Sequence, residues 1–191
     1  GMVNAVLDRI ARRLRAADSS PGVLDTIGDT EFYLFGGHPE DELRGRAGTI
    51  LARRDGAICR ATADGAVWIP QLRRRPAPGG PKTFKLPATL ALHGELDGVP
   101  EVPAPLTPTP GRRTYRQISY RESCGIGYLE FSFPGGAMST GQCRSLLAAY
   151  RRAQVRPVKV IVLGPPRDFF GNGIHLNVIE AAADPAGESW R

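Results

Sequence analysis

The sequence has few of the residues that build metal centres and disulfide frameworks. Its 191 residues include three cysteines and three histidines, and neither set has the spacing of a metal site. Cys59, Cys124 and Cys143 are also odd in number, which favours free, packed thiols in a reducing compartment over a disulfide scaffold. We therefore expect no metal, no disulfide framework and a cytoplasmic location.

The sequence also lacks a run of eighteen apolar residues and a secretory signal peptide, so we expect neither a membrane span nor export. Hydrophobic residues make up 41% and charged residues 23%, which is typical of a globular chain with one core or two small ones. The net charge of +6 would suit a polyanionic partner. Because only Arg73–Arg75 form a tight basic cluster, we interpret the charge as solvated surface and do not expect nucleic acid as a partner.

The first 92 residues predict a helix followed by a β region. Apolar positions at i, i+3, i+4 and i+7 over Val3–Arg15 predict an amphipathic helix within residues 1–20. Strand-like runs then fill residues 21–92, with Asp-Gly pairs at 55–56 and 64–65 that favour type I′ hairpin turns. The predicted strands are Val23–Thr26, Glu31–Phe35, Thr49–Arg54, Ala57–Ala63, Ala66–Leu72 and Phe84–Leu92. Such a series predicts a small antiparallel barrel, whose aromatic residues could be core or stacking platforms for bases, with core preferred.

The remaining residues predict a second domain after a proline-rich linker over residues 93–113. In residues 114–191, alternating runs at Tyr115–Glu122 and Ile126–Phe133 predict a hairpin. Ser139 with Gln142 forms a capping-box pair that opens a helix. An apolar strand at Val158–Leu163 then predicts a parallel crossover with both faces covered. The expected fold class is α+β.

The stretch Val158–Leu176 reads as a buried strand, a glycine-rich loop and the start of a helix, which can aim backbone N–H groups at an anion or a developing oxyanion. The loop lacks the Gly-Lys-Ser/Thr ending of a P-loop and the third glycine of a dinucleotide fingerprint. A purely structural turn remains an equal alternative. Ser139 as a nucleophile is not favoured, because capping the helix explains it.

Residues 127–176 resemble the start of the crotonase (enoyl-CoA hydratase/isomerase) superfamily. Gly127–Phe133 is similar to its first core strand, and Gly136-Ala137-Met138-Ser139 is similar to a turn that usually reads Asn-Ala-Leu-Ser. The run Asp168-Phe-Phe-Gly-Asn-Gly-Ile-His-Leu176 resembles the family's aromatic-x-x-Gly-Ala-Asp-Leu loop, with Ile174 and His175 in place of the usual small residue and Asp. The resemblance implies that Ile174, beside Gly173, gives one backbone N–H of an oxyanion hole for an acyl-CoA thioester. The implied coenzyme A contacts are Ala137, Phe170, Gly171, Asn172, Gly173 and Ile174.

The chain as a whole is similar to the HoxX-type hydrogenase maturation proteins, which join a formyltransferase-like part to a crotonase-like part. Gly48-Thr49-Ile50, Arg54-Asp55-Gly56 and Asp64–Ile69 resemble the C-terminal, OB-like domain of methionyl-tRNA formyltransferase, and Phe169–Trp190 resembles this branch of the crotonases. The resemblance implies formyl transfer to coenzyme A and decarbonylation of formyl-CoA to carbon monoxide for the [NiFe]-hydrogenase site.

The same resemblance predicts a partial, catalytically incomplete protein, because the folate-binding catalytic set and the second oxyanion glycine have no counterpart in these residues. The loop is then expected to bind without catalysing. The alternatives are a coenzyme A-binding or self-associating module and a nucleic-acid-binding OB-like module. One or two ββα turns cannot cover both faces of Val158–Leu163, so we expect a homo-oligomer formed through exposed apolar surface.

Overall fold

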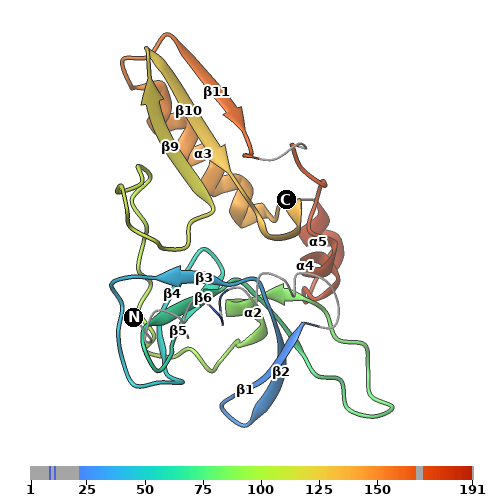
Figure 1. The fold of residues 1–191 in the computed structure, drawn as a ribbon. Helices are drawn as coiled ribbons and strands as arrows, with labels where there is room; N and C mark the ends of the chain where they lie inside the picture. Colours follow the sequence, from blue (N-terminus) through green and yellow to red (C-terminus); the bar gives the residue numbers. More distant parts are fainter. Residues whose placement is uncertain (1–8, 10, 12–21, 167–169, 191) are drawn as a thin grey trace. The chain divides into compact units, whose positions relative to one another are not determined.

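The computed structural model describes residue 9, residue 11, residues 22–166 and residues 170–190 (Figure 1). The predicted helix within residues 1–20 therefore lies outside the described residues, apart from two helical positions, of which Ala11 is fully buried. The chain divides into two compact units, residues 1–103 with 113–115 and residues 104–112 with 116–191. Both strands and helices are present, which confirms the α+β class.

The first unit is built from short antiparallel strands and one short helix. The elements are β1 (Val23–Ile27), β2 (Thr30–Phe35), β3 (His38–Glu40), β4 (Ile50–Arg54), β5 (Ala57–Ala61), β6 (Ala66–Ile69), β7 (Gln71–Arg74), β8 (Leu86–Pro87) and α2 (Ala88–Ala91). They form two four-stranded sheets, in the orders β1-β2-β7-β8 and β3-β6-β5-β4. The type I′ turn predicted at Asp55-Gly56 is confirmed, because both residues have positive φ, 49° and 78°.

The small barrel predicted for this region does not close among the described residues, whose strands pair into two sheets. The break falls where Gly36-Gly37 faces Pro70, between β2 and β3 on one side and β6 and β7 on the other. Phe35 lies opposite Gln71 and His38 lies opposite Trp68, so the register is the same on both sides of the break. Pro70 has no N–H to donate and Gly36 has a φ of 69°, so a continuous ladder cannot pass through this point. The two sheets are therefore two halves of one sharply bent sheet.

The inward side chains of the strands form the core of the first unit. Phe32, Leu34, Ile58, Ile69 and Leu72 are all at most 3% exposed and share one apolar cluster. Burying each such side chain contributes roughly 1.5–3 kcal/mol. A second cluster surrounds the fully buried Trp68 and Tyr115. The preference for core over stacking platforms is confirmed for Phe32, Phe35 and Trp68, which are buried. 

Three local predictions, two in this unit and one on the cysteines of the whole chain, are wrong. The run Phe84–Leu92 is not one strand, because Pro87 ends β8 and precedes α2. At Asp64-Gly65, neither residue has positive φ although both are described, so this turn is not type I′. Instead the Thr62 hydroxyl donates to Asp64 and the Thr62 N–H donates to the Gly65 carbonyl. Among the cysteines only Cys59 is buried, whereas Cys124 and Cys143 are exposed, which corrects the expectation of packed thiols.

The predicted linker contributes an extra edge to the first unit. The N–H of Arg53 in β4 donates to the Pro100 carbonyl, and the N–H of Val102 donates to the Arg53 carbonyl. Leu96 is buried in the core of the same unit. Residues 93–103 therefore pack on the first unit and do not form a free connector.

The second unit is a three-stranded sheet with one long helix against it. Its elements are β9 (Ile118–Ser123), β10 (Ile126–Phe131), the 3-10 turn η1 (Pro134–Gly136), α3 (Thr140–Gln154), β11 (Val160–Gly164), α4 (Leu176–Glu180) and α5 (Pro185–Ser189). The strand order is β11-β10-β9, with β9 antiparallel and β11 parallel to β10. The predicted hairpin, capping box and parallel crossover are confirmed: the Gln142 N–H donates to Ser139 Oγ, and the Ser139 N–H donates to Gln142 Oε1.

Helix α3 covers one face of this sheet and leaves the other open. Leu129 is buried together with Ala149 and Ala153 of α3, and Ile161 packs on the same side. The opposite side carries Val160 and Val162, which are 54% and 46% exposed. The expectation that β11 is covered on both faces is therefore wrong. On α3 itself, Ala149 and Ala153 are buried, whereas Cys143 and Leu147 are exposed.

Candidate functional site

The glycine-rich loop of the second unit is held against the turn after β10 by backbone hydrogen bonds. The Met138 N–H donates to the Gly173 carbonyl over 2.8 Å, and the His175 N–H donates to the Met138 carbonyl over 3.0 Å. The Asn172 N–H donates to the Gly136 carbonyl, and its side-chain amide donates to the Gly135 carbonyl. The structure thus brings together the two segments that the sequence had singled out.

The geometry of this pairing leaves the backbone N–H of Ile174 without a partner among the described residues. Met138 and Ile174 form a parallel β-bridge, in which the bonds run through Gly173 and His175, the neighbours of Ile174. In a parallel bridge the central residue points its own N–H away from the partner strand. The Ile174 N–H accordingly has no acceptor among the described residues, while the side chain of Ile174 is 58% exposed. Gly173, with a φ of 82°, allows the chain to turn just before this donor.

The predicted contact residues lie on the same exposed ridge. Gly171, Asn172, Gly173 and Ile174 are all exposed, and Ala137 is half-buried. Phe170 lies at the start of the loop, where its ring meets Phe131 edge-on with 5.1 Å between the ring centroids. This aromatic contact fixes one end of the loop, and the bridge to Met138 fixes the other.

A pocket of about 160 Å³ adjoins the loop on the side of α4 and α5. Met138 and Ile174 line it together with Cys143, and His175 is buried at its wall.

Ser139 caps α3, as predicted. Among the described residues no group of three His, Cys, Asp or Glu side chains could hold a metal ion. No helix of the described part is long and apolar enough to cross a membrane.

A buried polar network in the first unit was missed by the sequence analysis. Glu40 is fully buried on β3, where the Trp68 indole N–H donates to its Oε2 over 2.7 Å and the Thr114 hydroxyl donates to the same oxygen. Arg54, also buried, donates to Thr114 Oγ1 and to the Tyr115 carbonyl. Its guanidinium carbon lies 4.3 Å from the centroid of the Trp68 ring.

This network fixes residues 113–115 to the first unit and sets the ionisation of Glu40. Burial raises the pKa of Glu40, but the hydrogen bonds from Thr114, Trp68 and the backbone of Glu42 and Leu43 outweigh it and hold the pKa below its ordinary 4.5. The partners come from positions 28 and 74 residues away in the chain. No local pattern signals such a contact, because a buried glutamate and a surface glutamate look alike in sequence.

Comparisons with known proteins agree with this architecture. Residues 4–79 match the family described as formyl transferase, C-terminal domain. The chain is 42% identical over 182 residues to the hydrogenase maturation factor HoxX of Bradyrhizobium diazoefficiens, an alignment that covers 95% of this chain and 30% of that protein. A crystal structure of HypX from Aquifex aeolicus in complex with tetrahydrofolic acid matches with a TM-score of 0.86 and 46% identity over 92% of this chain and 30% of that one.

A double variant of the same HypX matches with a TM-score of 0.85 over the same shares of the two chains. The resemblance to the HoxX-type maturation proteins is therefore confirmed. The chain spans about 30% of the length of these relatives.

Proposed function

We propose that this chain is the central part of a HoxX-type hydrogenase maturation protein and takes part in formyl transfer to coenzyme A and in the breakdown of formyl-CoA to carbon monoxide. The similarity to HoxX and HypX over more than nine-tenths of the chain supports the placement. The tetrahydrofolate complex of HypX supports a role in formyl transfer. We further propose that the second unit is the first ββα turn of a crotonase-type domain.

The unpaired Ile174 N–H is the observation that carries the proposed role of the second unit. A backbone N–H that points out of an exposed loop can donate to the carbonyl oxygen of a bound thioester. The proposed ligand is coenzyme A or an acyl-CoA, held along the ridge formed by Ala137, Phe170 and residues 171–174. One donor orients the carbonyl, but a full oxyanion hole stabilises the developing charge with two or more donors. The described residues therefore bind the thioester and are catalytically incomplete on their own.

The Ile174→Pro variant tests this role, because proline removes the N–H but leaves the two bridge hydrogen bonds, neither of which uses it. We expect binding of acetyl-CoA to weaken by about tenfold and the downfield shift of a ¹³C-labelled carbonyl to be lost. That loss corresponds to roughly 1.4 kcal/mol, within the range of one hydrogen bond to a polarised carbonyl. Calorimetry and ¹³C NMR of the labelled thioester would measure the two effects.

Ile174→Ala is the matched control, since it keeps the N–H and removes only an exposed side chain. It should bind acetyl-CoA within about twofold of the parent chain. Absence of heat with the parent chain at millimolar coenzyme A would contradict the binding role. An unchanged carbonyl shift in Ile174→Pro, with binding intact, would contradict the assignment of the donor.

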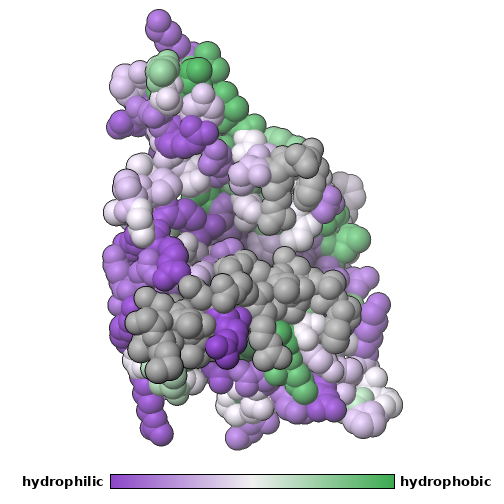
Figure 2. Space-filling model, in the orientation of Figure 1, coloured by the Kyte–Doolittle hydropathy of each residue, from purple (hydrophilic) through white to green (hydrophobic). Residues whose placement is uncertain are grey.

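A second candidate role, self-association, is favoured by the uncovered face of the sheet. Val160, Val162 and the edge of β11 are open, and the upper part of Figure 2 shows apolar atoms gathered over β11. We propose a second copy of the chain as the occupant of this face.

The free thiols at Cys124 and Cys143 support the proposed reducing, cytoplasmic compartment.

A further inference from the structure

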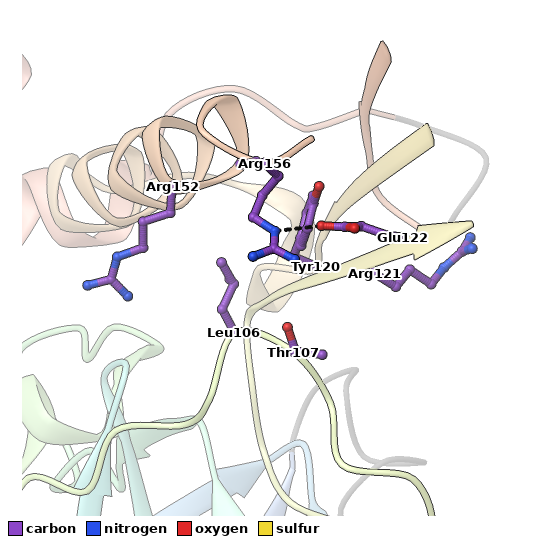
Figure 3. A pocket seen from close by; sticks show the side chains of 8 residues that line it. Leu106, Thr107, Tyr120, Arg121, Glu122, Arg152 and Arg156 are labelled. Carbon is purple, nitrogen blue, oxygen red and sulfur yellow. Dashed lines mark hydrogen bonds and ion pairs between the residues drawn. The ribbon is translucent and has the colours of Figure 1, made fainter. Parts of the chain in front are cut away.

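A pocket of about 390 Å³ in the second unit lies apart from the proposed thioester loop (Figure 3). The pocket and the loop lie at opposite ends of the sheet. Glu122 in the pocket wall pairs with Gly127 near the start of β10, whereas the last residue of β11, from which the chain continues to the loop, pairs with Glu130 near the end of β10. The lining residues are Leu106, Thr107, Tyr120, Arg121, Glu122, Arg152, Ala153 and Arg156. The pocket thus combines the 104–112 segment, β9 and the C-terminal turn of α3. 

The charges around this pocket do not balance. Three guanidinium groups line it against one carboxylate. Arg121 is bound to Glu130, and Arg156 donates through Nε to Glu122 over 2.7 Å, which leaves both Nη groups of Arg156 for other acceptors. Arg152 has no hydrogen-bond or ion-pair partner among the described residues. The pocket therefore carries a net positive charge and an uncompensated cation.

The buried Tyr120 hydroxyl lies in the same wall, beside the Glu122 carboxylate. Tyr120 is only 5% exposed, and its hydroxyl makes no hydrogen bond of normal geometry within the described part of the chain. Burial, and a poorly aligned hydrogen bond to the Glu122 carboxylate, raise the pKa of Tyr120, so the hydroxyl stays protonated. The ring occupies space that only Gly127 leaves free, since a Cβ at Gly127 would fall 2.5 Å from the hydroxyl oxygen. A donor with such poor alignment is available to a better-placed acceptor in the pocket.

The walls of the pocket thus offer donors in excess of acceptors. Arg152, Arg156, Tyr120 and Thr107 all present N–H or O–H groups, and the one carboxylate already accepts from Arg156. A ligand that fills the deficit must be rich in acceptor atoms and negatively charged. Guanidinium groups match the oxygens of phosphate particularly well, because they donate two parallel hydrogen bonds to them.

We propose that this pocket binds a phosphate group, either free or carried by a small organic molecule. Arg152 and Arg156 supply the charge, and the Tyr120 hydroxyl supplies a further donor that has only a poorly aligned contact with Glu122. The volume is within the range of small-molecule sites, and Leu106 with the Tyr120 ring and Ala153 gives an apolar wall for an organic part. Thr107 is held nearby because the Tyr120 N–H donates to the Leu106 carbonyl over 2.9 Å.

Titration calorimetry of the 191-residue chain with inorganic phosphate and with phenyl phosphate, at constant ionic strength, tests the proposal. We expect saturable binding that weakens by about tenfold in Arg152→Gln and about threefold in Tyr120→Phe, which removes only the hydroxyl. Arg151→Gln is the matched control: it removes the same charge from the next position of α3, outside the pocket, and should bind like the parent chain. Tighter binding of phenyl phosphate would identify an organic phosphate as the ligand, and equal or weaker binding would identify free phosphate.

Two results would overturn the proposal. One is the absence of saturable heat with both probes at millimolar concentration. The other is an equal loss in Arg151→Gln and Arg152→Gln, which would show only the general field of a basic surface. Both arginines are exposed on α3, so neither substitution is expected to unfold the unit, and circular dichroism of each variant would verify this.

Discussion

Replacement of Glu40 by alanine is expected to lower the free energy of unfolding of the first unit by about 3–5 kcal/mol. The carboxylate is fully buried and accepts hydrogen bonds from Trp68 and Thr114. Its removal leaves the Trp68 indole N–H without an acceptor, and also the Thr114 hydroxyl, which itself accepts from Arg54. The loss is large because the orphaned groups stay away from water while their partner is gone.

Urea unfolding followed by tryptophan fluorescence would measure this loss. Trp68 is fully buried and Trp190 is 91% exposed, so a Trp190→Phe background makes Trp68 the sole reporter of the first unit. Glu31→Ala is the matched control, because Glu31 forms a half-exposed pair with Arg75 whose loss should cost under about 1 kcal/mol. Equal losses in the two variants would contradict a structural role for the buried network.

The same carboxylate predicts a dependence of stability on pH. The pKa of Glu40 is lower in the folded chain than its ordinary 4.5, so the unfolded chain takes up the proton first as pH falls. The stabilisation is complete above about pH 4.5 and is lost as pH falls through the lower, folded value. The difference in unfolding free energy between the parent chain and Glu40→Gln should therefore shrink as pH falls below about 4.5 in urea titrations. A constant difference would show that Glu40 ionises alike in both states.

The features that could be predicted from sequence are those specified by neighbouring residues. The turn at Asp55-Gly56 requires two positive φ angles, and the box of Ser139 with Gln142 uses atoms three residues apart. Turn and cap chemistry of this kind is written into a few consecutive positions. Where one residue has two local roles the prediction was wrong, as at Pro87, which ends a strand and also precedes a helix.

The features that could not be predicted depend on contacts between distant segments. Glu40 meets Thr114 across 74 positions, and the phosphate pocket combines Thr107, Tyr120 and Arg152. Each of these side chains, taken alone, looks like an ordinary polar residue of a surface. The loop at Ile174 differs, because the family resemblance assigned this loop and the turn at Ala137 to the same binding site. The pairing itself follows from the parallel bridge, which no spacing in the sequence reveals.

A charge placed on the open face of β11 is expected to abolish self-association of the chain. Val160 and Val162 project from the side of the sheet that α3 does not cover, and β11 is an edge strand with unpaired backbone groups. Such an edge pairs readily with another strand, and a second copy offers an identical one. Val162→Lys puts an ammonium group into that contact, where burying it without a partner costs several kcal/mol. Association should weaken by at least about a hundredfold.

Light scattering and sedimentation over a range of concentrations would measure the change. Val155→Lys is the matched control, because Val155 is 83% exposed at the end of α3, outside β11, and its substitution should leave association unchanged. Equal dissociation of both variants would mean that net charge alone, and not the β11 face, controls assembly. A parent chain that stays monomeric at every concentration would mean that two copies do not cover this face. The apolar side of β11 would then have to be covered by a different segment or protein, because an open face of this kind is itself a liability in water.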